Sequence, residues 1–143
     1  MDDHVLVRGK VRVRKNGVVV YEGKNLVVNA GLTLIAKCLE GSGTAVSHMA
    51  VGDDVTTPVG DQTALVNELF RVSATVTQAD NSITVEADFT GLNSGGDETV
   101  REFGIFNASS AGEMLCRFIC QDIAWVVDDT LVVDWTINIG DLA

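Results

Sequence analysis

The residues best suited to do chemistry are three carboxylates in the longest polar segment of the chain, residues 52–63. Asp53 and Asp54 are adjacent, and Asp61 follows after the single proline. Carboxylates in loops can chelate Ca²⁺, which takes about six to eight oxygen ligands. This spacing lacks the alternating acids and the closing glutamate of an EF-hand. We therefore expect these aspartates to be solvated turn residues, with no bound metal and no cofactor.

The histidines and cysteines do not follow a pattern typical of zinc sites or nucleophilic catalysis. They are His4, His48, Cys38, Cys116 and Cys120, and no Cys-x-x-Cys or His-x-His pair occurs. No nucleophile elbow, P-loop, His-Glu-x-x-His or dinucleotide motif is present either. The sequence therefore predicts no catalytic residue and no enzyme activity. A Cys–His nucleophile pair, and with it a small hydrolase, stays open as an alternative.

Several of these residues are expected in structural roles. His48 alternates with Val46 and Ala50 in a short apolar segment. Cys116 and Cys120 lie four residues apart in an expected strand, so about 13 Å would separate them, too far for a disulfide. They are expected to behave as small buried hydrophobic residues.

The aromatic and paired charged residues suggest further structural roles. Trp125 and Trp135 are expected to anchor the core or an interface. A carbohydrate-binding module is the alternative, and it needs one of these tryptophans exposed on a concave face. Arg101, which precedes Glu102, is expected to form an internal ion pair.

Length and composition indicate one globular domain. The chain has 143 residues, of which 46% are hydrophobic and 21% charged, and its net charge is −10. Seven of the ten basic residues lie within residues 1–37: Arg8, Lys10, Arg12, Arg14, Lys15, Lys24 and Lys37. The remainder is strongly acidic and repels nucleic acid and anionic lipid, so neither is an expected partner. No apolar run is long enough to span a membrane and the N-terminus is unlike a signal peptide, so we expect synthesis in a cytoplasm.

The positions of apolar residues predict mainly strands. Residues 5–14 alternate between valines and basic residues, and Asn16-Gly17 then predicts a hairpin turn before residues 18–23. Apolar residues at helical spacing predict one helix near residues 30–40, with Asn29 as its cap and Gly41 or Gly43 at its end. Further strands are expected over 46–51, 70–76, 83–89, 100–106, 114–126 and 131–139, while 64–69 is ambiguous.

These elements predict an all-β fold. We expect an antiparallel two-sheet sandwich or jelly-roll-like barrel with one short helix near residues 30–40. Residues 1–143 are expected to form a single β domain, with a basic N-terminal hairpin at 5–23 that is used for subunit contacts.

Five segments of the chain, taken in order, resemble a group of known proteins. They are residues 25–32, 48–54, 61–71, 100–107 and 129–136. This order is similar to that of small structural proteins of tailed phages and prophages, either head cement (decoration) proteins or tail-fibre-like proteins. The resemblance implies a non-enzymatic virion protein with a jelly-roll-like fold and contributes no catalytic residue. A capsid cement protein that binds and stabilises the phage head is the preferred prediction, and a tail-fibre or baseplate protein is the alternative.

The expected partners follow from the N-terminal strand and from the resemblance. We expect a homodimer or homotrimer located in the virion, docked on the major capsid protein or, alternatively, on tail or baseplate proteins. The strand over residues 5–14 is expected to be a free edge, dry on one side and basic on the other, that pairs with a neighbouring copy. The candidate interface residues are Val5, Val7, Arg8, Lys10, Val11, Arg12, Val13 and Arg14. Pairing of this strand within its own sheet is the alternative.

Overall fold

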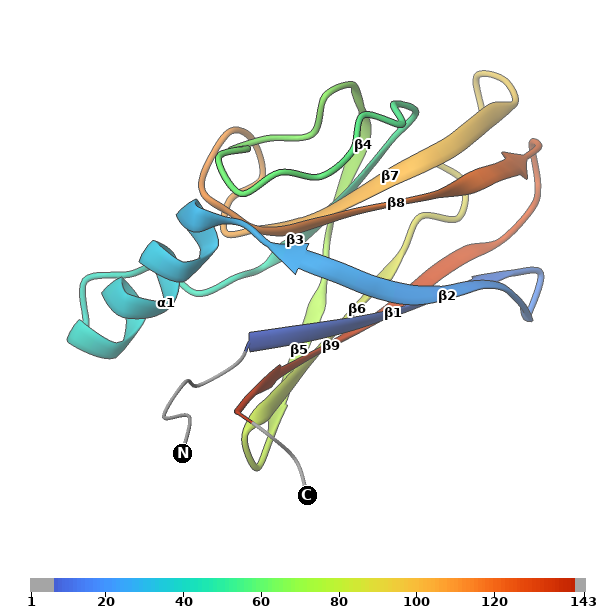
Figure 1. Cartoon of the computed structure of the whole chain (residues 1–143). Coiled ribbons are helices and arrows are strands. Elements are labelled where there is room, and N and C mark those ends of the chain that lie inside the picture. Colours follow the sequence, from blue (N-terminus) through green and yellow to red (C-terminus); the bar gives the residue numbers. More distant parts are fainter. Residues whose placement is uncertain (1–6, 141–143) are drawn as a thin grey trace.

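The computed structural model describes residues 7–140, except for the side chain of Leu26, as nine strands and one helix (Figure 1). The elements are β1 (Val7–Lys15), β2 (Val18–Val27), α1 (Asn29–Glu40), β3 (His48–Gly52), β4 (Glu68–Ser73), β5 (Thr75–Ala79), β6 (Ser82–Asp88), β7 (Glu98–Phe106), β8 (Met114–Trp125) and β9 (Leu131–Ile139). All strand pairs are antiparallel. Within this described part of the chain, no helix is long and apolar enough to cross a membrane.

The strands form two sheets that share one corner strand. Sheet A has the order β2-β1-β9-β6-β5, and sheet B has the order β4-β3-β7-β8. The last two residues of β2, Leu26 and Val27, leave sheet A and pair with β8. At the opposite corner, β4 and β5 are separated only by Ala74, so one nearly continuous segment serves both sheets. The predicted all-β, two-sheet antiparallel fold with one helix is confirmed.

The core lies between the two sheets and centres on aromatic rings. The ring of Phe118 stacks on that of Phe103 at 4.7 Å, and it meets Trp135 edge-on at 5.3 Å and Tyr21 at 5.7 Å. Phe103 and Phe118 come from sheet B, whereas Tyr21 and Trp135 come from sheet A. These contacts join the sheets, because buried aromatic pairs add to the free energy gained from burying their apolar surface.

The N-terminal hairpin forms as predicted, but its first strand is not an edge. Asn16 and Gly17 both have positive φ angles, 53° and 78°, as a tight hairpin turn requires. β1 pairs with β9 along its whole length on one side, and with β2 from Gly9 to Lys15 on the other. The prediction of a free edge at residues 5–14 is therefore wrong, because period-two alternation identifies the dry face of a strand and not its neighbours.

This pairing also changes the candidate interface. Val11 and Val13 are fully buried in the core of their own chain, so they cannot contact another subunit. Val7 is half-buried against the same core, and Val5 lies outside the described residues. Only the basic residues of the candidate set remain on the outer face of sheet A.

The helix forms close to its expected bounds but begins differently. Its N-cap is Val28, which makes no side-chain capping bond, so the prediction of Asn29 as the cap is wrong. The amide of Asn29 instead donates to the carbonyl of Gly60 at 2.7 Å, so a distant loop satisfies this helix end. Gly41 ends the helix in the left-handed conformation, as predicted.

Other element boundaries differ from expectation by a few residues. The strand expected over 46–51 is β3, His48–Gly52, and the ambiguous segment 64–69 is loop until β4 begins at Glu68. In the last strand, alternation predicts that Leu131, Val133, Trp135, Ile137 and Ile139 face inward; the first four are buried, but Ile139 is 42% exposed.

Candidate functional site

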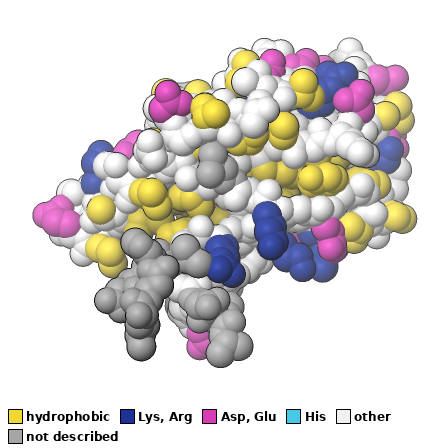
Figure 2. Space-filling view, viewed as in Figure 1, with side chains coloured by type: hydrophobic (Ala, Val, Ile, Leu, Met, Phe, Trp, Pro, Cys, Tyr) yellow, Lys and Arg dark blue, Asp and Glu magenta, His cyan; other side chains and the backbone are white. Residues whose placement is uncertain are grey.

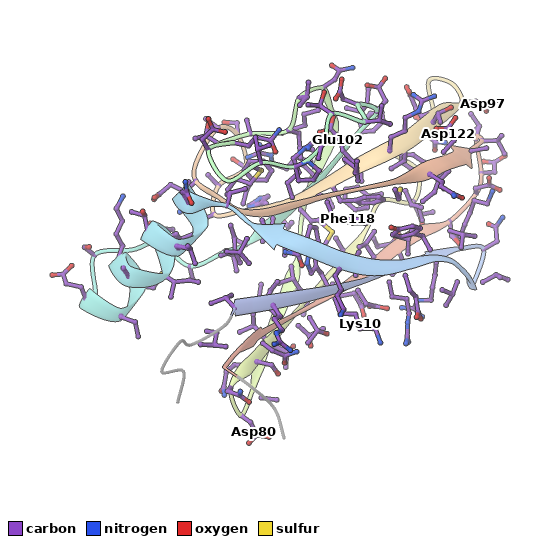
Figure 3. All side chains as sticks on the ribbon, viewed as in Figure 1. Lys10, Asp80, Asp97, Glu102, Phe118 and Asp122 are labelled. Atoms are coloured by element: carbon purple, nitrogen blue, oxygen red, sulfur yellow. The ribbon has the colours of Figure 1, made fainter. Side chains whose placement is uncertain are left out.

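The outer face of sheet A carries the charged side chains that alternate with the buried valines of β1. Arg12 donates to Glu22 at 2.9 Å, and Arg14 donates to Asp134 at 2.7 Å. Lys10 lies on the same face, directed away from the core in which Phe118 is buried (Figure 3). Because β1 is an inner strand of sheet A, its basic side chains are displayed on a rigid surface.

Two lysines on this face lie directly opposite each other. Lys10 of β1 pairs in register with Lys24 of β2, and both are exposed. Neither lysine forms an ion pair with any residue from 7 to 140. They line a shallow hollow of about 720 Å³, together with Arg8, Asn25 and other residues of β1, β2 and β9. Like charges at directly opposed positions destabilise a sheet, so this pair favours an anionic partner.

This hollow lies within a larger basic surface. Figure 2 shows several basic side chains gathered over β1 and β2, on a molecule whose net charge is −10. A smaller adjoining hollow of about 280 Å³ shares Lys10 and Asn138 with the first. We call the outward surface formed by Arg8, Lys10, Arg12, Arg14 and Lys24 the basic face.

Next to the basic face, two carboxyl groups repel each other. Glu86 of β6 lies opposite Asp134 of β9, and a hydrogen bond to Asp134 together with its negative charge raises the pKa of Glu86. A raised pKa means that the folded state binds this proton more tightly than the unfolded state. The associated stability is present below the ordinary glutamate pKa of 4.5 and is lost as the pH rises through the raised value.

We therefore expect Glu86→Gln to stabilise the protein at pH 7, by roughly a few tenths of a kcal/mol, since Glu86 is exposed and solvent screens the repulsion. The gain should disappear in acid, below about the ordinary glutamate pKa, where Glu86 is protonated in both states. Thermal unfolding across this pH range measures the difference. Asp88→Asn is the matched control on the same strand: the Thr90 hydrogen bonds lower the pKa of Asp88, so its loss should destabilise at pH 7. A lower melting temperature for Glu86→Gln at pH 7 would contradict the expectation.

On the opposite side of the molecule, a buried carboxylate holds the long β3–β4 loop on sheet B. The Glu102 side chain is fully buried and accepts hydrogen bonds from the backbone amides of Asp54, Val66 and Asn67 at 3.1, 3.0 and 2.8 Å. It also accepts from Nε of Arg117 at 3.1 Å. These bonds satisfy a charge that would otherwise be very costly to bury.

Arg117 extends the same network into the loop. Its guanidinium donates to the carbonyl of Thr56 at 2.7 Å and to Gln62 at 3.3 Å. Its Nη2 finds no hydrogen-bond partner within residues 7–140 and lies 4.0 Å from a carboxylate oxygen of Asp54. The pair therefore fixes the loop at several points along its length, which is a structural role.

The three candidate carboxylates of this loop do not converge. Asp53 accepts from the side chain of Asn67, and Asp54 accepts from the amide of Thr56 at 2.6 Å. Hydrogen bonds from the side chain of Thr56 and then from its backbone amide lower the pKa of Asp54. Asp61 is exposed. No group of three or more His, Cys, Asp or Glu residues suited to a metal ion occurs over residues 7–140.

His48 and the cysteines are placed as follows. The ring of His48 contacts the hydroxyls of Ser47 at 2.7 Å and Ser73 at 3.4 Å. Burial raises the pKa of Cys120 to about 12 and also raises that of Cys116, so both thiols stay protonated. These two cysteines are free and buried, as expected, whereas Cys38 is exposed on α1.

Both tryptophans are core anchors. Trp125 and Trp135 are fully buried. Their indole N–H groups donate to the carbonyl of Asp129 at 3.1 Å and to Asn25 at 2.7 Å. Neither ring is available to stack on a sugar, so the carbohydrate-binding alternative loses the feature on which it depended.

The buried ion pair was not identified from the sequence. Arg101, expected in an internal pair, instead binds Asp122 at the surface at 2.7 Å and lowers the pKa of that carboxyl. The internal pair uses its neighbour Glu102. The available signal was a glutamate within the apolar run Val100–Phe106, where a charged side chain needs a buried partner.

Comparison with known proteins identifies no relative of this chain. No family model, no curated protein and no solved structure matches it.

Proposed function

We propose that this chain is a non-enzymatic structural protein of a tailed-phage virion that docks through its basic face. Lys10 opposite Lys24 is the observation that carries the docking surface. These two positive charges have no ion-pair partner among residues 7–140, and an anionic surface would relieve the repulsion between them. The preferred role is a capsid cement protein that binds acidic side chains of the major capsid protein and stabilises the head.

The placement of the phage-like segments supports a structural role. Residues 48–54, 61–71 and 100–107 meet at Glu102, whose bonds hold the loop against sheet B. A loop held by this many hydrogen bonds keeps one shape, which favours a structural protein that packs against its neighbours. The fold then provides two different surfaces: the basic face of sheet A, and the β3–β4 loop that is held against sheet B.

The docking surface can be tested by neutralising the two lysines. We expect Lys10→Gln/Lys24→Gln to weaken binding to empty heads of the encoding phage about tenfold or more, measured by co-sedimentation at physiological salt. Lys37→Glu is the matched control: it changes the net charge by the same two units, but Lys37 lies on α1 and pairs with Glu113. Binding of the wild type should weaken with added salt.

The same assay distinguishes the alternatives. Binding to purified tails and not to heads would replace the cement role with the tail-fibre or baseplate role. Binding to heads that is unchanged in the double variant would overturn the basic face as the docking surface. Binding to neither particle would overturn the virion proposal itself.

A further inference from the structure

The strand at the open edge of sheet A is unusually unprotected. Among the strands of residues 7–140, β5 ends the strand order and pairs with β6 on one side only, and all five of its residues are exposed. Its sequence, Thr-Val-Thr-Gln-Ala, contains no charge and no proline, and its ladder with β6 shows no bulge. Natural edge strands usually carry one of these features because an open edge attracts another strand.

The register of the β5–β6 hairpin shows which backbone groups are open. Ala79 and Ser82 flank a two-residue turn, and in such hairpins the closing pair exchanges both hydrogen bonds. Alternation along an antiparallel ladder then directs the backbone of Thr77 towards β6. The N–H and C=O groups of Val76 and Gln78 point to the open edge, where no described strand pairs with them.

Other edges of the sheets carry charges that β5 lacks. β4, at the free edge of sheet B, carries the Glu68–Arg71 ion pair at 2.7 Å, and β2 carries Glu22 and Lys24. Beside β5 lies an apolar groove of about 330 Å³, to which Leu39, Val76, Ile83 and Ile139 contribute. The open backbone of β5 therefore adjoins apolar surface, and the strand itself carries no charge that would oppose an identical strand.

We propose that two copies of this chain associate by antiparallel pairing of β5 with β5 across a two-fold axis, which joins their five-stranded sheets into one of ten strands. With Thr77 on the axis, Val76 lies opposite Gln78 of the second copy. The open groups of these two residues then match as two donors and two acceptors on each side, giving about four backbone hydrogen bonds. A strand centred on this axis is complementary to itself, as a two-fold interface requires.

Charge and apolar contact are compatible with this arrangement. β5 itself carries no acid, and the acids that end the two paired strands, Asp80 in each copy, are six residues apart along the strands, or about 20 Å. That separation exceeds the screening length of about 8 Å at physiological salt, so the repulsion between these two aspartates is weak. Val76, now 39% exposed, would be covered by the second copy.

The test measures the mass of the full chain by light scattering over a wide concentration range. We expect a dimer for the wild type and a monomer for Gln78→Pro, which removes an outward N–H without breaking the ladder to β6. Gln78→Thr keeps that N–H and should remain a dimer. Thr77→Lys, which places two positive charges on the axis, should also be monomeric, and it decides the test if the proline variant does not fold. A monomeric wild type, or a dimer that persists in Thr77→Lys, would overturn the proposal.

Crosslinking tests the register directly. Residues facing each other on the axis lie about 4.5 Å apart at Cα, within disulfide range. In a Cys38→Ser background, Thr77→Cys should form an intermolecular disulfide on mild oxidation. Thr75→Cys is the control, because its two copies would lie about 14 Å apart. Equal crosslinking at both positions would refute this register. The dimer is independent of docking: loss of head binding with an intact dimer affects only the proposed function.

Discussion

Replacing Glu102 by alanine should destabilise the fold by about 3–5 kcal/mol, because it leaves the fully buried Arg117 guanidinium without its carboxylate. The change also removes the acceptor for three backbone amides, each of which is costly to leave unsatisfied. Since domains of this size are stable by only about 5–15 kcal/mol, a large fraction of the stability is at risk. Denaturant unfolding at pH 7 measures the loss.

The control is Glu22→Ala, which removes a carboxylate from the exposed pair with Arg12. Exposed pairs contribute about 0–1 kcal/mol, so this variant should unfold nearly like the wild type. Equal, small losses for both variants would show that the buried pair is not an important source of stability.

A local measurement separates loop release from general destabilisation. Glu102→Gln keeps the shape of the side chain and one acceptor oxygen but loses the charge. We expect faster hydrogen exchange at the amides of Asp54, Val66 and Asn67, with little change at the amides of β1 and β9. Uniformly faster exchange throughout the chain would argue against a local clamp on the loop.

The sequence predicted most strands because their signals are local. Alternation over residues 70–89 and 131–139, and the Asn16-Gly17 turn, depend on neighbouring residues that choose extended backbone and a tight reversal. Pairing between distant segments has no such local signal. β1 pairs with β9 across nearly the full length of the chain, and this pairing is what turned an expected edge into an inner strand.

The basic face illustrates a second limit. A two-residue turn at Asn16-Gly17, continued without interruption, would place Lys10 opposite Gly23. A register shift between Val13 and Arg14 moves the pairing by one residue, so Lys10 lies opposite Lys24 and Arg12 opposite Glu22. The same shift places Tyr21 on the core side, against Phe118. Burial of the Tyr21 ring against the opposite sheet accounts for the register shift. The sequence pattern of a hairpin does not reveal such a shift by itself.

The β3–β4 loop shows that its own carboxylates did not reveal what holds it in place. Its visible aspartates, Asp53, Asp54 and Asp61, have the residue types of a cation site but do not converge. What fixes the loop is Glu102, a residue that is 35 positions from its nearest loop contact, Asn67. The same long-range support explains why segment 64–69 had no clear helical or extended pattern.

Gly31 provides the second large expected effect, and its sign opposes helix propensity. In an isolated helix, alanine is favoured over glycine by about 1 kcal/mol, so Gly31→Ala would be expected to stabilise α1. In the folded chain, a Cβ atom at Gly31 would lie only 2.0 Å from the carbonyl oxygen of Leu115 on β8. That carbonyl also accepts a hydrogen bond from the amide of Val28 at 3.3 Å. The start of α1 would have to move away from β8 to make room for the Cβ atom, and this hydrogen bond opposes the movement.

We therefore expect Gly31→Ala to lower the free energy of unfolding by about 1–3 kcal/mol, the usual cost of forcing atoms into a packed contact. Denaturant unfolding measures the change, and the helical signal in the far ultraviolet shows whether α1 survives. Gly95→Ala is the matched control, because nothing lies within 4 Å of its added methyl group, and it should change stability by less than about 0.5 kcal/mol. A stabilised Gly31→Ala variant would mean that propensity outweighs packing here and that α1 can move away from β8 at little cost.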